Sequence, residues 1–98
     1  MSELRFVIMH RPGPGWQRDR PVLEQPGLQA HAQHFRDWFM AGKLSLGGPF
    51  MDAGGGGMMI PAPGLSEAEV RAQADADPAV KSGLLVYELR AWMPALHL

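Results

Sequence analysis

The spacing of apolar residues divides the chain into a short series of strands and helices. Phe6 to Met9 are four consecutive apolar residues, so the strand predicted over Leu4–Met9 should be covered on both faces. Later, apolar positions recur every three to four residues, which is the period of an amphipathic helix. This helix should begin at Pro26 and end at Gly42. Its apolar stripe consists of Leu28, Ala32, Phe35, Trp38 and Phe39.

The connection Arg11–Gln25 between these two elements is rich in proline and glycine. Loops of this length without structure of their own are typically lids, binding loops or disordered segments. Trp16 lies in the middle of the loop, where its indole either packs inward to anchor the chain or faces a ligand. Both alternatives stay open at this stage.

A hairpin follows the first helix. Leu44–Phe50 and Met58–Pro61 are short apolar stretches that predict two strands. Asp52–Gly57 lies between them and contains four consecutive glycines, which is typical of a turn. Pro49 near the end of the first of these strands indicates an edge position in the sheet.

The last third of the chain predicts a second helix and a final strand. Ser66 and Glu69 form the S-x-x-E capping box that begins a helix. This helix should stop at Asp77, because a residue before proline avoids the α region. Apolar and polar residues then alternate through Gly83–Trp92, which predicts a strand.

The resulting order β-α-β-β-α-β predicts an α+β, ferredoxin-like fold. Right-handed crossovers then require a four-stranded antiparallel sheet with both helices on one face. We expect residues 1–98 to form a single domain, since domains of about 100 residues are common. The open face of the sheet holds residues too apolar for water, which favours a homodimer.

This topology predicts that polar residues distant in sequence meet at one rim of the sheet. The first strand ends at His10 and the first helix begins at the same edge with His31. The second strand brings Asp52 to this edge, and the second helix brings Asp77. The loop that contains Trp16 also lies there.

His31 falls within the apolar stripe of its helix, where a lone histidine is more often a core residue than a catalyst. An acid on the same rim changes that interpretation. A carboxylate bonded to one ring nitrogen fixes the tautomer and leaves the other nitrogen to act as acid or base. Asp52 and Asp77 are both candidates, although Asp52 suits a glycine turn and Asp77 suits a helix end before proline.

Composition excludes several function classes. A net charge of -1 offers no basic field for nucleic acid, and no apolar run approaches the length of a membrane span. The absence of cysteine removes thiolate chemistry and disulfides. We also expect a cytoplasmic protein with no metal and no cofactor. His31 and His34 have no third ligand at a convincing spacing. The glycine run lacks the Lys-Ser/Thr ending of a phosphate loop.

Several short motifs, in this order and spacing, resemble the YciI-like (YCII-related) family: His31 to Leu44, Gly47–Asp52, Asp77–Val80, Gly83–Leu85 and Arg90–Trp92. The resemblance implies a dimeric ferredoxin-like α+β barrel and a His–Asp site. His31 matches the family histidine, Asp77 the Asp-Pro element, and Asp52 an acid of some members. Members often carry arginine at the position of Leu28, and Arg11 could substitute for it. Some relatives are similar in fold to muconolactone isomerase, and one branch is a dehydrochlorinase.

We therefore expect a small enzyme in which His31 is a general acid/base on a cyclic or aromatic small molecule. Asp77 or Asp52 would orient the histidine. The substrate-binding candidates are His10, Arg11, Trp16 and Phe35. The alternative is a non-catalytic module of the same fold that binds a small ligand or another protein.

Overall fold

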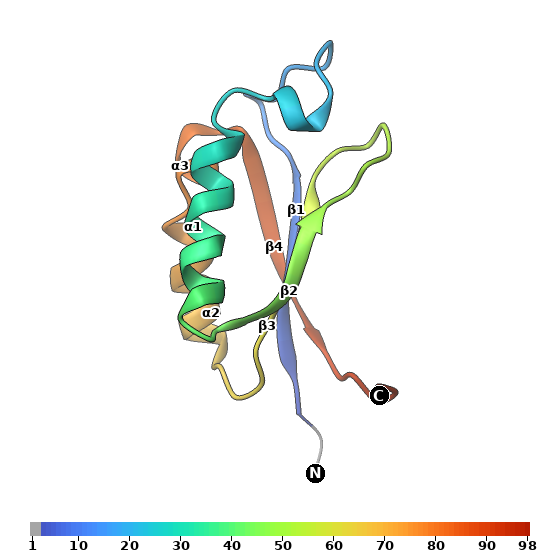
Figure 1. The fold of residues 1–98 in the computed structure, drawn as a ribbon, viewed down its shortest axis with the longest axis vertical. Coiled ribbons are helices and arrows are strands. Elements are labelled where there is room, and N and C mark those ends of the chain that lie inside the picture. Colours follow the sequence, from blue (N-terminus) through green and yellow to red (C-terminus); the bar gives the residue numbers. More distant parts are fainter. Residues whose placement is uncertain (1–2) are drawn as a thin grey trace.

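The computed structural model describes residues 3–98. Figure 1 shows the order of elements along the chain. They are β1 (Arg5–Pro12), the 3₁₀ turn η1 (Val22–Glu24), α1 (Leu28–Met40), β2 (Leu44–Pro49), β3 (Gly57–Pro61), α2 (Glu67–Asp75), α3 (Pro78–Ser82) and β4 (Leu85–Trp92).

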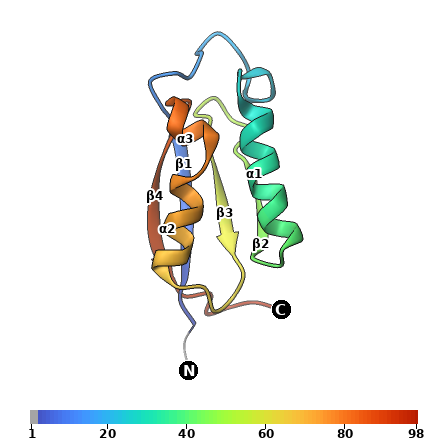
Figure 2. The ribbon, with the colours of Figure 1, turned by 90° about the vertical axis from the view of Figure 1, so that its left-hand side faces the viewer.

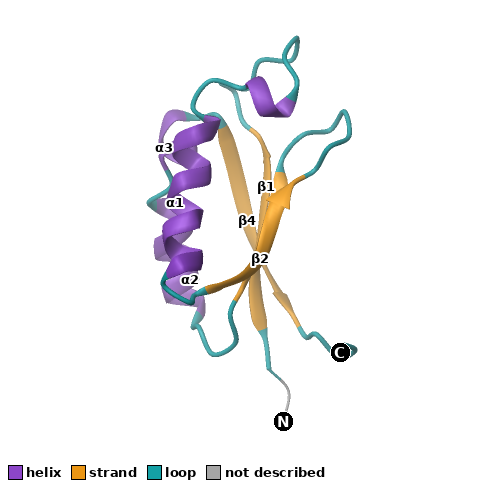
Figure 3. Cartoon of the chain, viewed as in Figure 1, coloured by secondary structure: helices purple, strands orange, loops and turns teal. Residues whose placement is uncertain are grey.

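The four strands form one antiparallel sheet in the order β2-β3-β1-β4. The helices lie on one face of this sheet, and α1 and α2 run side by side over it (Figures 1 and 2). Figure 3 shows the same two layers by secondary structure. The α+β, ferredoxin-like prediction is confirmed.

The core lies between the sheet and the helices, where the apolar side chains of the strands meet the apolar stripes of the helices. Ile8 from β1 and Met59 from β3 are paired in the sheet and pack against Phe35 and Trp38 of α1. Val70 of α2 closes the other side of the same core. Because strand side chains alternate between faces, His10 points toward the helices together with Ile8. The alternation therefore places the imidazole of His10 next to Ile8 on the face of β1 that the helices cover.

The structure differs from the sequence prediction around Asp77. The second helix does not continue to this residue: α2 ends at Asp75, and a further short helix, α3, begins at Pro78. Asp77 is the N-cap of α3, with Pro78 in the first turn, where its missing N–H costs nothing. The capping box of Ser66 and Glu69 at the start of α2 is confirmed.

The first strand is longer than predicted, and the loop after it is ordered by side-chain bonds. β1 continues past Met9 to Pro12, paired with β4 throughout. Gln25 is buried, and its amide bonds the backbone of Gln17 and the carbonyl of Arg20. A buried amide that holds three backbone groups fixes the path of the loop that carries Trp16. Within residues 3–98, no helix combines the length and apolarity needed to cross a membrane.

Candidate acid–base site

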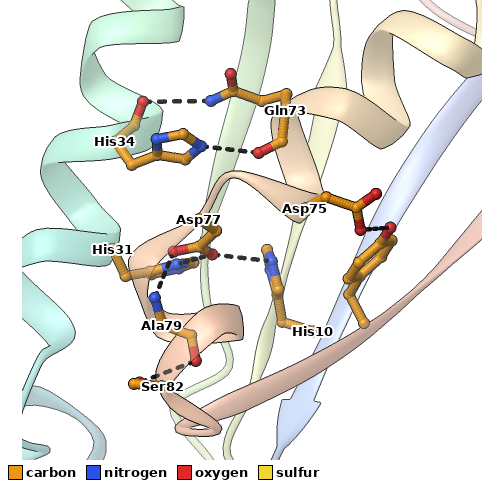
Figure 4. Close-up of polar contacts among 9 residues, drawn as sticks. His10, His31, His34, Gln73, Asp75, Asp77, Ala79 and Ser82 are labelled. Carbon is orange, nitrogen blue, oxygen red and sulfur yellow. Dashed lines mark hydrogen bonds and ion pairs between the residues drawn. The ribbon is translucent and has the colours of Figure 1, made fainter.

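His31 and Asp77 meet in the interior of the protein, although 46 positions separate them in sequence. His31 lies in the first turns of α1, and Asp77 caps α3, which packs beside that end of α1. Nδ1 of His31 and Oδ2 of Asp77 are 2.6 Å apart (Figure 4). The predicted convergence of these two residues is therefore present in the structure.

Both carboxylate oxygens of Asp77 accept hydrogen bonds. Oδ1 accepts from the backbone N–H of Ala79 at 2.9 Å, and Oδ2 faces Nδ1 of His31. Burial works to raise the pKa of Asp77, but the hydrogen bond and charge of His31 and the Ala79 amide outweigh it and leave this pKa below its ordinary value. Asp77 is thus an anion that can only accept. Nδ1 of His31 must carry a proton, which leaves Nε2 as the nitrogen that exchanges protons.

His10 is the third polar residue of the cluster, and it differs from His31. Its Nε2 lies 3.7 Å from Oδ2 of Asp77, and within residues 3–98 neither ring nitrogen has a hydrogen-bond partner. The ring packs edge-on against His31 and Phe35, with centroid distances of 4.9 and 5.6 Å. Burial and the neighbouring His31 lower the pKa of His10 to about 4, although Asp77 works in the opposite direction. At neutral pH this imidazole is uncharged.

A cavity of about 550 Å³ lies beside His31, between α1 and the β2–β3 hairpin. This volume is in the range of small-molecule sites. Most of its wall is apolar, with Trp16, Val22, Leu28, Phe35, Phe39, Leu44 and Met59 among the lining residues. His10 and His31 also line the cavity, although both ring nitrogens of His10 are buried. The Phe35 ring packs against His31 with the ring centroids 5.3 Å apart, and Trp16 lines the same cavity.

Gly56 shapes the part of the wall beside His10. Its φ is +76°, a conformation that residues with a side chain rarely adopt. A Cβ atom at this position would also collide with the carbonyl oxygen of His10. The glycine run is therefore the turn that the sequence predicts, and its last residues let the hairpin approach β1 closely.

Asp52 is not brought to His31. It lies exposed in the loop after β2, where its Oδ1 accepts from the backbone N–H of Gly54 at 3.0 Å. This is the turn-stabilising bond that Asp favours before glycine. Of the two acids that the sequence left open, Asp77 is the one in contact with His31.

Arg11 is not among the described residues that line the cavity. Strand alternation turns it to the face opposite His10, where its guanidinium pairs with Glu88 at 3.2 Å. The sequence prediction did not assign Arg11 to a face of the sheet, because the predicted strand did not extend to this residue.

His34 is half-buried and has a structural role. Its Nε2 lies 2.8 Å from the carbonyl oxygen of Gln73, and the amide of Gln73 donates back to the carbonyl of His34 (Figure 4). These two bonds connect α1 to α2. His34 therefore offers a matched control for experiments on His31.

Two imidazoles and a carboxylate are also a donor set that binds divalent transition metals. The potential ligand atoms of His10, His31 and Asp77 lie within 4.8 Å of one another. However, two ligands of one tetrahedral metal ion are about 3.3 Å apart, and Nδ1 of His31 and Oδ2 of Asp77 are only 2.6 Å apart. In this geometry the pair shares a proton, and a metal would require Asp77 to move away.

Comparisons of the chain with protein-family models, with curated proteins and with solved structures gave no match.

Proposed function

We propose that this chain is a small enzyme in which His31, oriented by Asp77, transfers a proton to or from a cyclic or aromatic molecule bound in the cavity. One observation carries the proposal. The carboxylate of Asp77 occupies Nδ1 of His31, no described hydrogen bond occupies Nε2, and His31 is among the residues that line a cavity of small-molecule size. A positioned base beside an apolar pocket is the minimum that isomerisation or elimination requires.

The proton transfer follows from the groups present. Nε2 of His31 accepts a proton from an acidic C–H of the ligand, and the C–H electron pair remains on the ligand. The resulting imidazolium is stabilised by the anionic Asp77. Return of the proton to another carbon completes an isomerisation. Departure of an anionic leaving group such as chloride, with formation of a double bond, completes an elimination.

The surroundings of the pair suit this chemistry. A general base contributes a factor of about 10²–10⁴ to a rate, so the pocket must supply the remaining acceleration by orientation. Phe35 and Trp16 give flat apolar surfaces for a ring. His10 is neutral, so it adds no second positive charge that would oppose protonation of His31. The resemblance to the YciI-like family supports the same kind of site.

A second candidate function is a ligand-binding module without catalysis. The double role of Asp77 favours it, since the same carboxylate caps α3 and bonds α1. In that case the His31–Asp77 bond would only fasten two helices together, and the cavity would bind a ligand without changing it.

Solvent-deuterium exchange distinguishes these candidates without knowledge of the natural substrate. Cyclic ketones, lactones and phenols with acidic C–H bonds are incubated with the protein in D₂O, and exchange is followed by NMR. The enzyme proposal predicts catalysed exchange of at least one compound that is lost in His31→Asn and kept in His34→Asn. Binding of such compounds with no exchange above the uncatalysed rate would support the ligand-binding module instead.

A cytoplasmic homodimer is part of the same proposal. The sheet face opposite the helices presents apolar side chains such as Val86 and Trp92, which are 38% and 43% exposed. Pairing two such faces would bury surface that a domain of this size otherwise leaves in water. Sedimentation velocity over a range of concentrations would test the oligomeric state. A monomer at all concentrations would contradict the proposed homodimer.

A further inference from the structure

One face of α1 forms a wall of the cavity, and this face contains a single charged residue. Residues at positions 28, 31, 32, 35, 36 and 39 follow the helical period and all line the cavity. Arg36 is the only one of them with a formal charge. The sequence prediction of an apolar stripe on this helix did not include it.

The charge of Arg36 is not balanced within the cavity wall. Among the described residues that line the cavity there is no aspartate or glutamate, and His10 is neutral. The Asp77 carboxylate lies behind His31, is fully buried and is already bonded to His31 and Ala79. A ligand in this cavity therefore meets apolar surface, His31 and Arg36, which is the one side chain with a formal charge among the described lining residues.

We propose that the cavity selects anionic ring compounds, with the carboxylate or phenolate of the ligand paired to Arg36 and the reacting carbon at His31. Only one part of this inference depends on the proposed function, namely the position of the reacting carbon at His31. Five residues of helix correspond to a rise of roughly 7.5 Å and a rotation of roughly 140°, so His31 and Arg36 lie at opposite edges of the α1 face that lines the cavity. This separation suits a ligand of one or two rings that carries its anionic group at the end remote from the acidic C–H.

The guanidinium is free to serve such a ligand. Its described hydrogen bond is to Oε1 of Gln33 at 3.2 Å, between two exposed side chains of the same helix. A carboxylate binds a guanidinium through two charge-assisted bonds and would replace this neutral contact. The simpler interpretation is that the aliphatic stem of Arg36 only covers apolar surface. The two interpretations differ in whether ligand charge matters.

An NMR titration of the whole chain with 2-naphthoate and its neutral analogue 2-naphthamide distinguishes an anion-binding Arg36 from one whose stem only covers apolar surface. In the wild type, both probes should shift the imidazole signals of His31, and naphthoate should bind about tenfold more tightly because of its ion pair with Arg36. Arg36→Met should remove this preference while naphthamide binds as before. Because the described hydrogen bond of Arg36 is exposed, this variant should fold normally, which its amide spectrum will show.

Arg18→Met is the matched control, since Arg18 lines the adjoining, more polar cavity, which shares Trp16 and Val22 with the first cavity but does not include Arg36. The proposal requires that this variant keep the preference for naphthoate. Equal binding of the two probes by the wild type, no binding of either, or loss of the preference in Arg18→Met but not in Arg36→Met would overturn it. The outcome is independent of catalysis. If the charge preference depends on Arg36 but no deuterium exchange is catalysed, the inference about Arg36 stands and the proposal of an enzyme is rejected.

Discussion

Nδ1 of His31 donates to Oδ2 of Asp77 over 2.6 Å, and this bond joins the beginning of α1 to the cap of α3. The same aspartate accepts a hydrogen bond from the backbone N–H of Ala79. Asp77 therefore stabilises α3, the helix that holds Asp77 in place. Orientation of the imidazole and folding of α3 are therefore coupled through one buried carboxylate.

Replacement of Asp77 by asparagine should separate these two roles. Asparagine is a good N-cap, so α3 should remain folded. Its amide would donate to Nδ1 of His31 and drive the proton to Nε2, the wrong tautomer for a base. We expect any His31-dependent exchange rate to fall by about two to four orders of magnitude. An unchanged rate in a folded Asp77→Asn protein would show that Asp77 does not orient the base.

His10 should make the protein less stable in acid. Its pKa of about 4 lies below the 6.5 of an unfolded histidine, so the unfolded chain binds more protons between these values. Stability is therefore complete above pH 6.5 and is lost as the pH falls toward 4, by on the order of 3 kcal/mol. The lowered pKa of Asp77 adds a loss of the same sign at still lower pH.

Urea unfolding at several pH values measures this dependence. In His10→Phe the unpartnered imidazole is replaced by an apolar ring, so the decline between pH 6.5 and 4 should be much shallower than in the wild type. Equal slopes in the two proteins would mean that His10 is protonated as easily in the folded state as in the unfolded one.

Gln25 should control the loop that carries Trp16. Removal of its side chain in Gln25→Ala leaves the backbone groups of Gln17 and the carbonyl of Arg20 without their buried partner. We expect a loss of about 1–3 kcal/mol in unfolding free energy and faster amide exchange over residues 13–25, measured by mass spectrometry. Gln17→Ala is the control, because this residue contributes its backbone and not its side chain to the bonds.

Asp52 should not matter for proton transfer. Its carboxylate is exposed and stabilises only the turn to Gly54. Asp52→Ala should therefore keep the exchange rate and lose less than about 1 kcal/mol of stability. A rate as low as that of His31→Asn would show that the hairpin loop closes onto the cavity during the reaction.

The sequence was sufficient for the fold because its two hydrophobic periods and its turn residues agree. It was also sufficient to bring His10, His31 and Asp77 to one edge, since this follows from topology. It could not choose between Asp52 and Asp77, because the choice depends on loop conformation. One cue was available: an aspartate followed by proline is typical of a helix start as well as a helix end, and Asp77 is the start of α3.

The position of Arg11 has a similar origin. Successive side chains of a strand point to opposite faces, and the predicted strand did not extend to Arg11. Arg36 was missed for another reason. An exposed arginine near an apolar stripe is common, and only the structure shows that its helix face lines a cavity.

The central claim is that Nε2 of His31 has a free lone pair toward the cavity while Nδ1 carries the proton shared with Asp77. Long-range ¹H–¹⁵N correlation, recorded under conditions in which the spectra show the His31 ring in its neutral form, reports this directly. The account predicts a protonated Nδ1 and an unprotonated Nε2, with the tautomer reversed in Asp77→Asn. A wild-type His31 with its proton on Nε2 would contradict it.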